Sequence, residues 1–580
     1  MPPYAFVARI VLESLLPQLD HPFEYGVPAR LAQQVTPGVR VRVPLRRGSQ
    51  HVTGFVVETA REPAHDGELS EVEGVVSVLP VLAPEVWKLA RAVADRGAGT
   101  AADVLRLAIP ARAARVEMSG PGEEPGAPLP QPPAAPGHPA GYFAGHLEGR
   151  SRLALTVPPG VVRFPAGRPG GERWLRSWAP TLASAAVACL RRGESAILAV
   201  PDHRDTDEVE AALAGAGAAA WTARIDATGS NTRRYRAFLS CLAGPRIVIG
   251  NRSALYAPAT KLGLIAVWDD GDPIHAEPRA PYAHARDVAL LRQQQQSTAL
   301  IFAAYARSTA VERLVRIGWL AAAGPERVTR PRVIVTSRQA DDGRGARIPS
   351  GAFQAAQEAS RDGPVLVQVA RPGYAPVLSC DTCREPARCP HCHGPLGLAA
   401  PGAAPACRRC GRSVPGWSCP VCGGTRLRMI GVGASRTAEE LGRAFPGLSV
   451  VVADGEHPVD RIPATPALVI ATRGAEPSAE GGYRAVLLLD AARMLRRESL
   501  WVAEDCLRVW TNAAALAAPG APVVLVGVAG PLADAFSTWR HERYAERELD
   551  DRALLRLPPA VRIATVTGRP AALEAAREAL

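Results

Sequence analysis

Eight cysteines are the residues of this sequence whose type and spacing predict chemistry most directly. They form four Cys-x-x-Cys pairs: Cys380 and Cys383, Cys389 and Cys392, Cys407 and Cys410, Cys419 and Cys422. Each pair supplies two thiolates from one tight turn, and two pairs complete a tetrahedral four-cysteine site for zinc. The sequence therefore predicts two Zn²⁺ ions with a structural role, because a four-cysteine site leaves no coordination position open for water.

The cysteine spacing leaves the pairing open, since nested and sequential arrangements both give two four-cysteine sites. A redox role is disfavoured, because four pairs in so short a segment exceed any thioredoxin-like motif. His391 and His393 lie among the ligands and are interpreted as solvated neighbours. Cys189, Cys241 and Cys506 stand alone and are predicted to be core residues. Metal binding is expected to supply much of the folding energy of this segment, about 10 kcal/mol per ion.

A shortage of lysine excludes one large class of enzymes. The 580-residue chain has 67 Lys and Arg against 56 Asp and Glu, a formal charge of +11, yet its lysines are Lys88 and Lys261 alone. A phosphate-binding P-loop requires Gly-x-x-x-x-Gly-Lys followed by Ser or Thr. Leucine follows both lysines, so the chain has no standard P-loop.

Alternation of helical and strand patterns predicts a multidomain α/β protein with parallel sheets. Residues 1–110 read as a small β-rich domain, with strands over 40–44 and 52–57 and a helix over 84–95. Residues 111–150 are a proline- and glycine-rich linker. Further buried strands are predicted over 196–200, 246–249, 264–268, 298–303, 332–335, 365–369, 448–452, 467–470, 485–489 and 523–528.

No segment reads as a signal peptide or a membrane span, because prolines interrupt the longest uncharged stretch, 513–533. We therefore expect a cytoplasmic protein, associated with the nucleoid if it binds DNA.

Several short motifs give the chain a family resemblance. The cysteine segment is flanked by 372–378 and 431–436, and 250–255, 281–288 and Pro22–Tyr25 precede it in the expected order. Together they resemble the PriA family of replication restart helicases, in a degenerate actinobacterial form. The resemblance implies a 3′-end DNA-binding domain over 1–110, a linker over 111–150 in place of a winged helix, and two RecA-like helicase lobes. Lobe 1 covers 151–330; lobe 2 covers 331–375 and 429–540, with the zinc module 376–428 inserted and a partial C-terminal domain over 541–580.

The resemblance also implies particular site residues. The knuckles pair in nested fashion in this family, which assigns Cys380, Cys383, Cys419 and Cys422 to one zinc and Cys389, Cys392, Cys407 and Cys410 to the other. Phe23, Glu24 and Tyr25 match a Phe-Asp-Tyr segment, in which an aromatic ring stacks on the terminal base and a carboxylate accepts the 3′-hydroxyl proton. Phosphate contacts are expected from Arg40, Arg42, Arg46 and Arg47. The alternative is a strand with solvated arginines.

The parts of the family that hydrolyse ATP are missing from this sequence. Residues 178–185 replace the Walker A motif, 303–306 the Gly-Ser-Ala-Thr motif, and 511–517 the motif with the arginine finger. At the Walker B position Asp269 and Asp270 remain as a relic that can touch a metal, but the glutamate that polarises water is gone. We therefore expect no catalytic residues, and no working role for ATP and Mg²⁺.

The predicted function is that of a DNA-binding component of the replication restart primosome, which recognises stalled forks without helicase activity. Its expected partners are DNA (forks, D-loops, 3′ ends and single strands) and other primosome proteins, including single-strand-binding protein and the replicative helicase. Two alternatives stay open at this point. One is a DNA-dependent ATPase and 3′-to-5′ helicase with a divergent nucleotide site. The other is a zinc-ribbon interaction protein without a role at forks.

Overall fold

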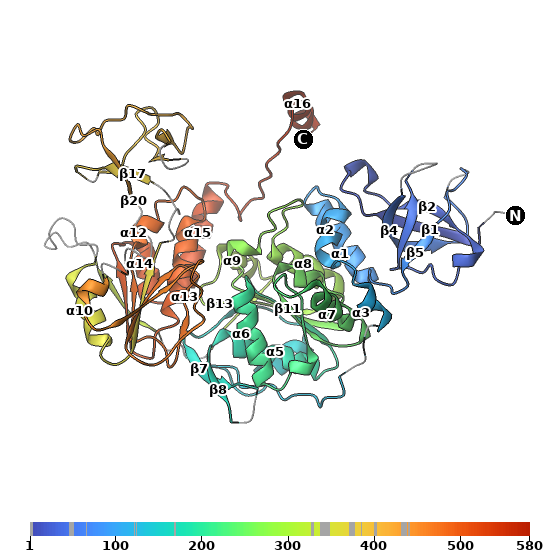
Figure 1. Cartoon of the computed structure of the whole chain (residues 1–580), viewed down its shortest axis with the longest axis horizontal. Coiled ribbons are helices and arrows are strands. Elements are labelled where there is room, and N and C mark those ends of the chain that lie inside the picture. Colours follow the sequence, from blue (N-terminus) through green and yellow to red (C-terminus); the bar gives the residue numbers. More distant parts are fainter. Residues whose placement is uncertain are drawn as a thin grey trace.

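A computed structural model gives the arrangement of the elements (Figure 1). It describes residues 4–45, 51–64, 67–120, 122, 125–167, 170–325, 330–336, 348–370, 377–383, 385–398, 403–430, 438 and 441–579. None of the helices in these ranges combines the length and the apolar character that crossing a bilayer requires.

The N-terminal unit is a five-stranded antiparallel sheet with the order β2-β1-β4-β3-β5. Its strands are β1 Phe6–Leu12, β2 Phe23–Val27, β3 Arg40–Pro44, β4 His51–Ala60 and β5 Gly74–Ser77. Alternate residues of these strands point inward and form a separate hydrophobic core that includes Ile10, Val41 and Val56. The two strands predicted in this region are confirmed.

Helices α1 (Pro84–Arg96) and α2 (Ala101–Ala108) follow this sheet but share the core of the next domain. The helix predicted over 84–95 is confirmed, and Pro84 stands in its first turn, where a missing N–H costs nothing. Helix α2 begins with a capping box between Thr100 and Asp103. Both helices contact lobe 1 at α8 (Ala285–Gln296) and at the 3-10 turn Arg252–Tyr256.

The proline- and glycine-rich segment lies along lobe 1 instead of hanging free. It contains the short helices α3 (Ala114–Met118) and α4 (Tyr142–Glu148). Glu117 in α3 accepts hydrogen bonds from Ser77 Oγ at 2.5 Å and from the Tyr235 hydroxyl at 2.6 Å. Although the segment cannot build a core of its own, it therefore joins the N-terminal sheet to lobe 1.

Lobe 1 is a parallel sheet with the order β10-β11-β9-β12-β13-β6-β14, covered by helices on both faces. Its strands are β6 Arg152–Thr156, β9 Ser195–Ala199, β10 Thr222–Arg224, β11 Ile247–Gly250, β12 Leu262–Trp268, β13 Ala299–Ala304 and β14 Ala321–Ala323. Its helices are α5 Trp178–Leu190, α6 His203–Gly215, α7 Asn231–Ala243, α8 and α9 Thr309–Arg316. Strands β12 and β13 are buried throughout, as parallel strands between two helical layers must be.

Lobe 2 repeats this plan with the parallel order β15-β26-β25-β16-β23-β21. Its strands are β15 Arg332–Thr336, β16 Pro364–Val369, β21 Ser449–Ala453, β23 Ala467–Thr472, β25 Ala485–Leu488 and β26 Pro522–Val526. Its helices are α10 Ser350–Ala359, α12 Ala491–Met494, α13 Val502–Ala514 and α14 Pro531–Ser537. The short strands β22 Arg461–Ile462 and β24 Ser478–Ala479 form a separate parallel pair. Every strand predicted for the two lobes is present within two residues of its expected ends.

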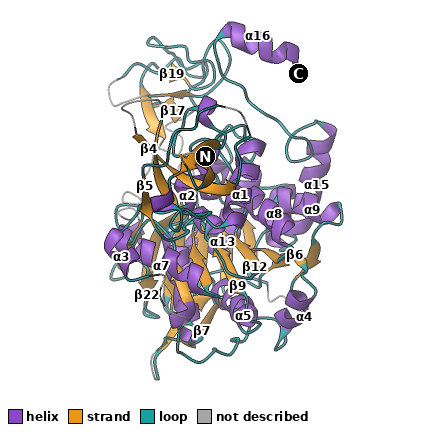
Figure 2. Cartoon of the chain, turned by 90° about the vertical axis from the view of Figure 1, so that its right-hand side faces the viewer, coloured by secondary structure: helices purple, strands orange, loops and turns teal. Residues whose placement is uncertain are grey.

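Two further parts extend from lobe 2. The cysteine module is inserted between β16 and β21 and lies beyond the lobe in Figure 1. Helix α15 (His541–Leu554) packs against α9 of lobe 1 and against α14, so it belongs with the lobes and not with a domain that begins at 541. Helix α16 (Pro570–Ala579) buries no residue and stands away from the lobes in Figures 1 and 2.

Candidate metal centres and nucleic-acid interface

The structure gathers the eight paired cysteines into two clusters of four. Cys380, Cys383, Cys419 and Cys422 form one cluster, and Cys389, Cys392, Cys407 and Cys410 form the other, with the Sγ atoms of each within 4.8 Å of one another. Four sulfurs bound tetrahedrally to zinc at 2.3 Å are separated by about 3.8 Å. The separations across the clusters are 3.4 to 3.9 Å. The grouping is the nested one, and both donor sets fit a tetrahedral metal ion.

Backbone amides around the sulfurs favour the thiolate form that a metal needs. The backbone N–H groups of Arg409 and Cys410 both donate to Cys407 Sγ at 3.4 Å. A bond from the backbone N–H of Cys383 lowers the pKa of Cys380 to about 6. A Cβ atom at Gly424 would lie 3.1 Å from the Cys380 sulfur, so the chain passes too close to the sulfurs for a larger residue.

The module has little apolar material to hold it together without metal. Strand β17 (Val377–Cys380) pairs with β20 (Leu427–Ile430), and β18 (Leu396–Gly397) pairs with β19 (Ala406–Cys407). Apart from the cysteines, its buried apolar residues are Leu378, Ala387, Leu396, Val414 and Trp417. His391 and His393 are exposed and lie outside both clusters. By contrast, Cys189, Cys241 and Cys506 are fully buried in the lobes, which confirms them as core residues.

In the N-terminal sheet, Tyr25 does not have the place that the stacking role requires. Its side chain is 5% exposed in the core, and its hydroxyl donates to the carbonyl of Pro44 at 3.1 Å. Burial raises the pKa of this hydroxyl. Phe23 lies two residues earlier on the same face, half-buried against His21 with a ring separation of 4.1 Å. Of the two aromatic rings, only Phe23 keeps a face that a base can reach.

Glu24 points to the opposite face of β2 and is already engaged. Its side chain is 8% exposed, and it accepts a hydrogen bond from Arg9 Nε at 3.0 Å and one from the backbone N–H of Ala64 at 2.9 Å. Because Phe23, Glu24 and Tyr25 alternate across the strand, the structure does not bring them together in one pocket. A 3′-hydroxyl would have to share the carboxylate with Arg9.

We expect Tyr25→Ala to lower the free energy of unfolding by about 3–5 kcal/mol, the usual cost of removing a buried aromatic ring. Tyr25→Phe removes one hydrogen bond and should cost about 1 kcal/mol. Urea unfolding of the full chain checks both values. Equal, negligible losses for both variants would show that this ring is not part of the core.

The arginines of β3 divide into a paired and a free member. Arg40 forms an ion pair with Glu13 at 2.9 Å, and its guanidinium lies 4.8 Å from the ring centre of Phe55. Arg42 is exposed on the same strand. Arg46 and Arg47 lie outside the described residues. Among the described members of the predicted cluster, Arg42 is therefore the one best placed for a phosphate.

Between the lobes, a β-hairpin occupies the position of a phosphate-binding loop. In P-loop proteins a strand is followed by a glycine-rich loop and then by a helix whose N-terminus binds phosphate. Here β6 ends at Thr156, and the hairpin of β7 (Val161–Pro165) and β8 (Glu172–Arg176) comes before α5. Residues 178–185, expected to replace the loop, all belong to the buried first turns of α5. Nothing in this arrangement presents helix N–H groups to a ligand.

Aromatic rings fill the space at the start of α5. Trp178 is fully buried and stacks on Trp268 at the end of β12, with ring centres 4.7 Å apart and an angle of 10° between the planes. Tyr305, at the end of β13, packs edge-on against Trp268 at 5.1 Å. The carboxyl ends of the central strands, where parallel α/β sheets bind ligands, are therefore closed by side chains.

Asp269 and Asp270, the relic of the Walker B motif, are both buried and both paired. Asp269 accepts from Arg508 Nη1 at 2.6 Å and from Asn512 Nδ2 at 2.8 Å, both on α13 of lobe 2. Asp270 accepts from Arg286 at 2.6 Å and from Ser308 Oγ at 2.7 Å. Burial raises the pKa of Asp269, and Arg508 opposes that shift. These carboxylates are used as structural acceptors.

Arg508 also reaches Asp272 at 3.0 Å, and other contacts tie the lobes together beside it. Arg176 of the hairpin donates to Ser478 Oγ at 3.2 Å and to the carbonyl of Glu476 at 2.8 Å. Thr309 of α9 donates to Glu504 of α13. The two lobes are thus fastened at several buried points, and we call the set Arg508, Asn512, Asp269 and Asp272 the interlobe clamp.

Sequence reasoning missed the lobe 2 half of this clamp. The expectation for 511–517 concerned only the lost arginine finger, whereas the functional side chains lie on α13 just before and within that segment. Arg508 and Asn512 are four residues apart, which places them on one face of a helix. That spacing was the available signal, but nothing in the sequence linked it to Asp269.

Comparison with known proteins places the chain. A family model described as the PriA 3′ DNA-binding domain matches residues 9–110. The probable replication restart protein PriA of Mycobacterium tuberculosis (strain H37Rv) is 44% identical over 97% of this chain and 87% of its own length. The corresponding Mycobacterium leprae protein is 42% identical over 96% and 87%. The chain belongs to the PriA family. Among solved structures, the helicase MrfA bound to DNA and AMPPNP covers 70% of the chain and 50% of that protein at 9% identity, with a TM-score of 0.38.

The PriA 3′ DNA-binding domain spans two physical parts of this structure. It includes the N-terminal sheet with its own core, and also α1 and α2, which are packed into lobe 1. As a PriA family member the chain is a DNA-binding replication restart protein, and its DNA-binding domain is continuous with the helicase-like lobes.

Proposed function

We propose that this chain recognises abandoned replication forks and directs assembly of the primosome on them without ATP-driven unwinding. The observation that carries the proposal is the state of the cleft between the lobes. A helicase needs lobes that open and close around a nucleotide. Here a hairpin stands in the place of the phosphate loop, Trp178 and Trp268 fill the ligand end of the sheet, and Asp269 is bound to lobe 2.

Several features support DNA recognition as the remaining activity. The match to the 3′ DNA-binding domain and the exposed Arg42 support contact with a 3′ end near a junction. In the cysteine module, exposed arginines provide a second surface for phosphates: Arg388, Arg408, Arg409, Arg412 and Arg426. Zinc is the proposed metal because eight thiolates in tetrahedral groups select it. Single-strand-binding protein and the replicative helicase are the proposed protein partners.

Two measurements on the full, metal-loaded chain test this proposal. In the first, we expect forked DNA with a 3′ end at the junction to bind at least about tenfold more tightly than a random duplex at physiological salt. In the second, we expect no ATP hydrolysis or strand displacement in the presence of forks beyond the level of an Asp270→Asn control.

The two measurements separate the alternatives. Fork-stimulated hydrolysis in the chain that Asp270→Asn removes would establish a divergent ATPase and overturn the proposal. Equal affinity for forks and random duplex would favour a zinc-ribbon interaction protein instead. A salt slope smaller for Arg42→Ala, with unchanged preference for forks, would place Arg42 on a phosphate.

A further inference from the structure

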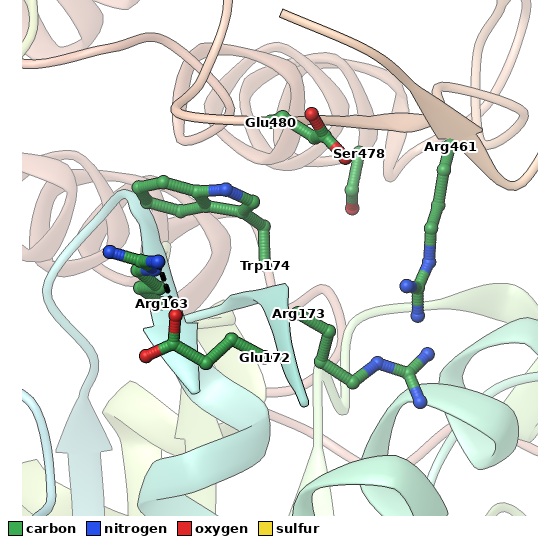
Figure 3. A pocket seen from close by; sticks show the side chains of 7 residues that line it. All are labelled: Arg163, Glu172, Arg173, Trp174, Arg461, Ser478 and Glu480. Carbon is green, nitrogen blue, oxygen red and sulfur yellow. Dashed lines mark ion pairs between the residues drawn. The ribbon is translucent and has the colours of Figure 1, made fainter. Parts of the chain in front are cut away.

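A hollow of about 180 Å³ lies between the β7–β8 hairpin of lobe 1 and the β22–β24 pair of lobe 2 (Figure 3). It is lined by Arg163, Glu172, Arg173, Trp174, Arg461, Ser478 and Glu480. A second hollow of about 150 Å³ adjoins it and shares Arg173, Trp174, Arg461 and Ser478. None of these residues belongs to the motor motifs discussed above, and the interlobe clamp does not use them.

Two guanidinium groups in this hollow have no acidic partner. Arg163 is joined to Glu172 in an ion pair across the hairpin. Arg173 and Arg461 extend into the other side of the hollow (Figure 3). Within the described part of the chain neither side chain forms an ion pair or a hydrogen bond, and Arg173 Nε is buried without a partner. Two converging guanidiniums suit a phosphate, which accepts charge-assisted hydrogen bonds from both.

Trp174 and Ser478 add the features of a nucleotide site. The Trp174 indole is half-buried at the wall of the hollow, and a Cβ at Gly481 would lie 4.0 Å from its ring. An indole held at the edge of a hollow is a stacking surface for a base. Ser478 Oγ accepts from Arg176 Nε at 3.2 Å, so its own O–H is available to be donated.

We propose that this hollow binds a free nucleoside mono- or diphosphate, with the base on Trp174 and the phosphate between Arg173 and Arg461. A compact ligand is favoured over a DNA strand because exposed carboxylates stand around the opening: Glu172, Glu480 and Asp460. A polyanionic strand leaving the hollow would pass these charges, whereas a single nucleotide ends inside them. Since Arg173 belongs to lobe 1 and Arg461 to lobe 2, the bound nucleotide links the lobes without being hydrolysed.

The proposal is tested by isothermal titration of ADP into the full, metal-loaded chain. We expect saturable binding that Arg461→Glu and Trp174→Ala each weaken by about tenfold, as expected for loss of a charge-assisted hydrogen bond or a stacked base. Arg236→Glu, an exposed arginine of α7 away from the hollow, is the matched control and should bind ADP like the unaltered chain. Adenosine and inorganic phosphate, titrated separately, should each bind more weakly than ADP.

Three outcomes would overturn the proposal. The first is no saturable binding of ADP at millimolar concentration, and the second is equal loss in the Arg236→Glu control. The third is displacement of ADP by a short oligothymidine at lower concentration than by ADP itself, which would assign the hollow to a DNA strand. Fork binding is measured separately, so failure here leaves the proposed function intact.

Discussion

Removal of metal from the full chain is expected to unfold the cysteine module, because each structural zinc site contributes on the order of 10 kcal/mol to folding. The module has two short strand pairs and a small apolar cluster, which are too few contacts to order it alone. Hydrogen exchange after chelation should show loss of protection over 377–398 and 403–430. The N-terminal sheet has its own core and should keep its protection.

Cysteine variants provide the matched comparison. Cys419→Ser removes one ligand and should abolish protection in the module, whereas Cys189→Ala alters a buried thiol of lobe 1 outside both clusters. Cys189→Ala should leave metal content at two ions per chain. Simultaneous loss of the module and the N-terminal sheet on chelation would contradict the modular reading, and so would full protection without metal.

Arg508→Ala is expected to lower the free energy of unfolding by about 3–5 kcal/mol, because it leaves the buried Asp269 without its main cation. Urea unfolding of the full chain measures the loss. Arg236→Ala, at an exposed site on α7, is the control for removing an arginine and should have almost no effect. The double variant Arg508→Ala with Asp269→Asn should recover part of the loss, since no buried charge then remains.

The loss should also depend on pH. Burial raises the pKa of Asp269, and removal of Arg508 takes away the positive charge that opposes this shift. The folded variant then binds a proton at a pH where the unfolded chain is ionised, so its stability falls as pH rises through that range. Relative to the unaltered chain, the deficit should shrink between pH 8 and about pH 5. A deficit that grows on acidification would rule out Asp269 as the stranded charge.

The sequence carried much of the fold because its signals were local. Buried runs such as 264–268 and 523–528 have no polar face, which is the pattern of a parallel strand between helices. The cysteine spacing likewise identifies a metal module from a few residues. In contrast, β6 and β14 are short and carry no comparable run, so lobe 1 was predicted without two of its strands.

Long-range partners were beyond sequence reasoning. The charge of Arg508 has a meaning only once Asp269, more than two hundred positions away, lies 2.6 Å from it. Tyr25 illustrates the opposite error, since a motif resemblance suggested a ligand contact where alternation along β2 places the ring in the core. Which face of a strand is buried depends on its neighbours in the sheet, and the motif alone does not state them.

Glu117 has a consequence for how DNA is presented to the molecule. Its carboxylate binds Ser77 of the N-terminal sheet, Arg112 of the connecting segment and Tyr235 of lobe 1. Despite its burial, bonds from Ser77, Tyr235 and Arg112 lower the pKa of this group, so it stays ionised at neutral pH. One side chain thus fixes the angle between the part that receives a strand end and the platform beside it. A junction whose arms diverge at another angle must bend to bind, and the energy of bending selects among branched DNAs before any base is read.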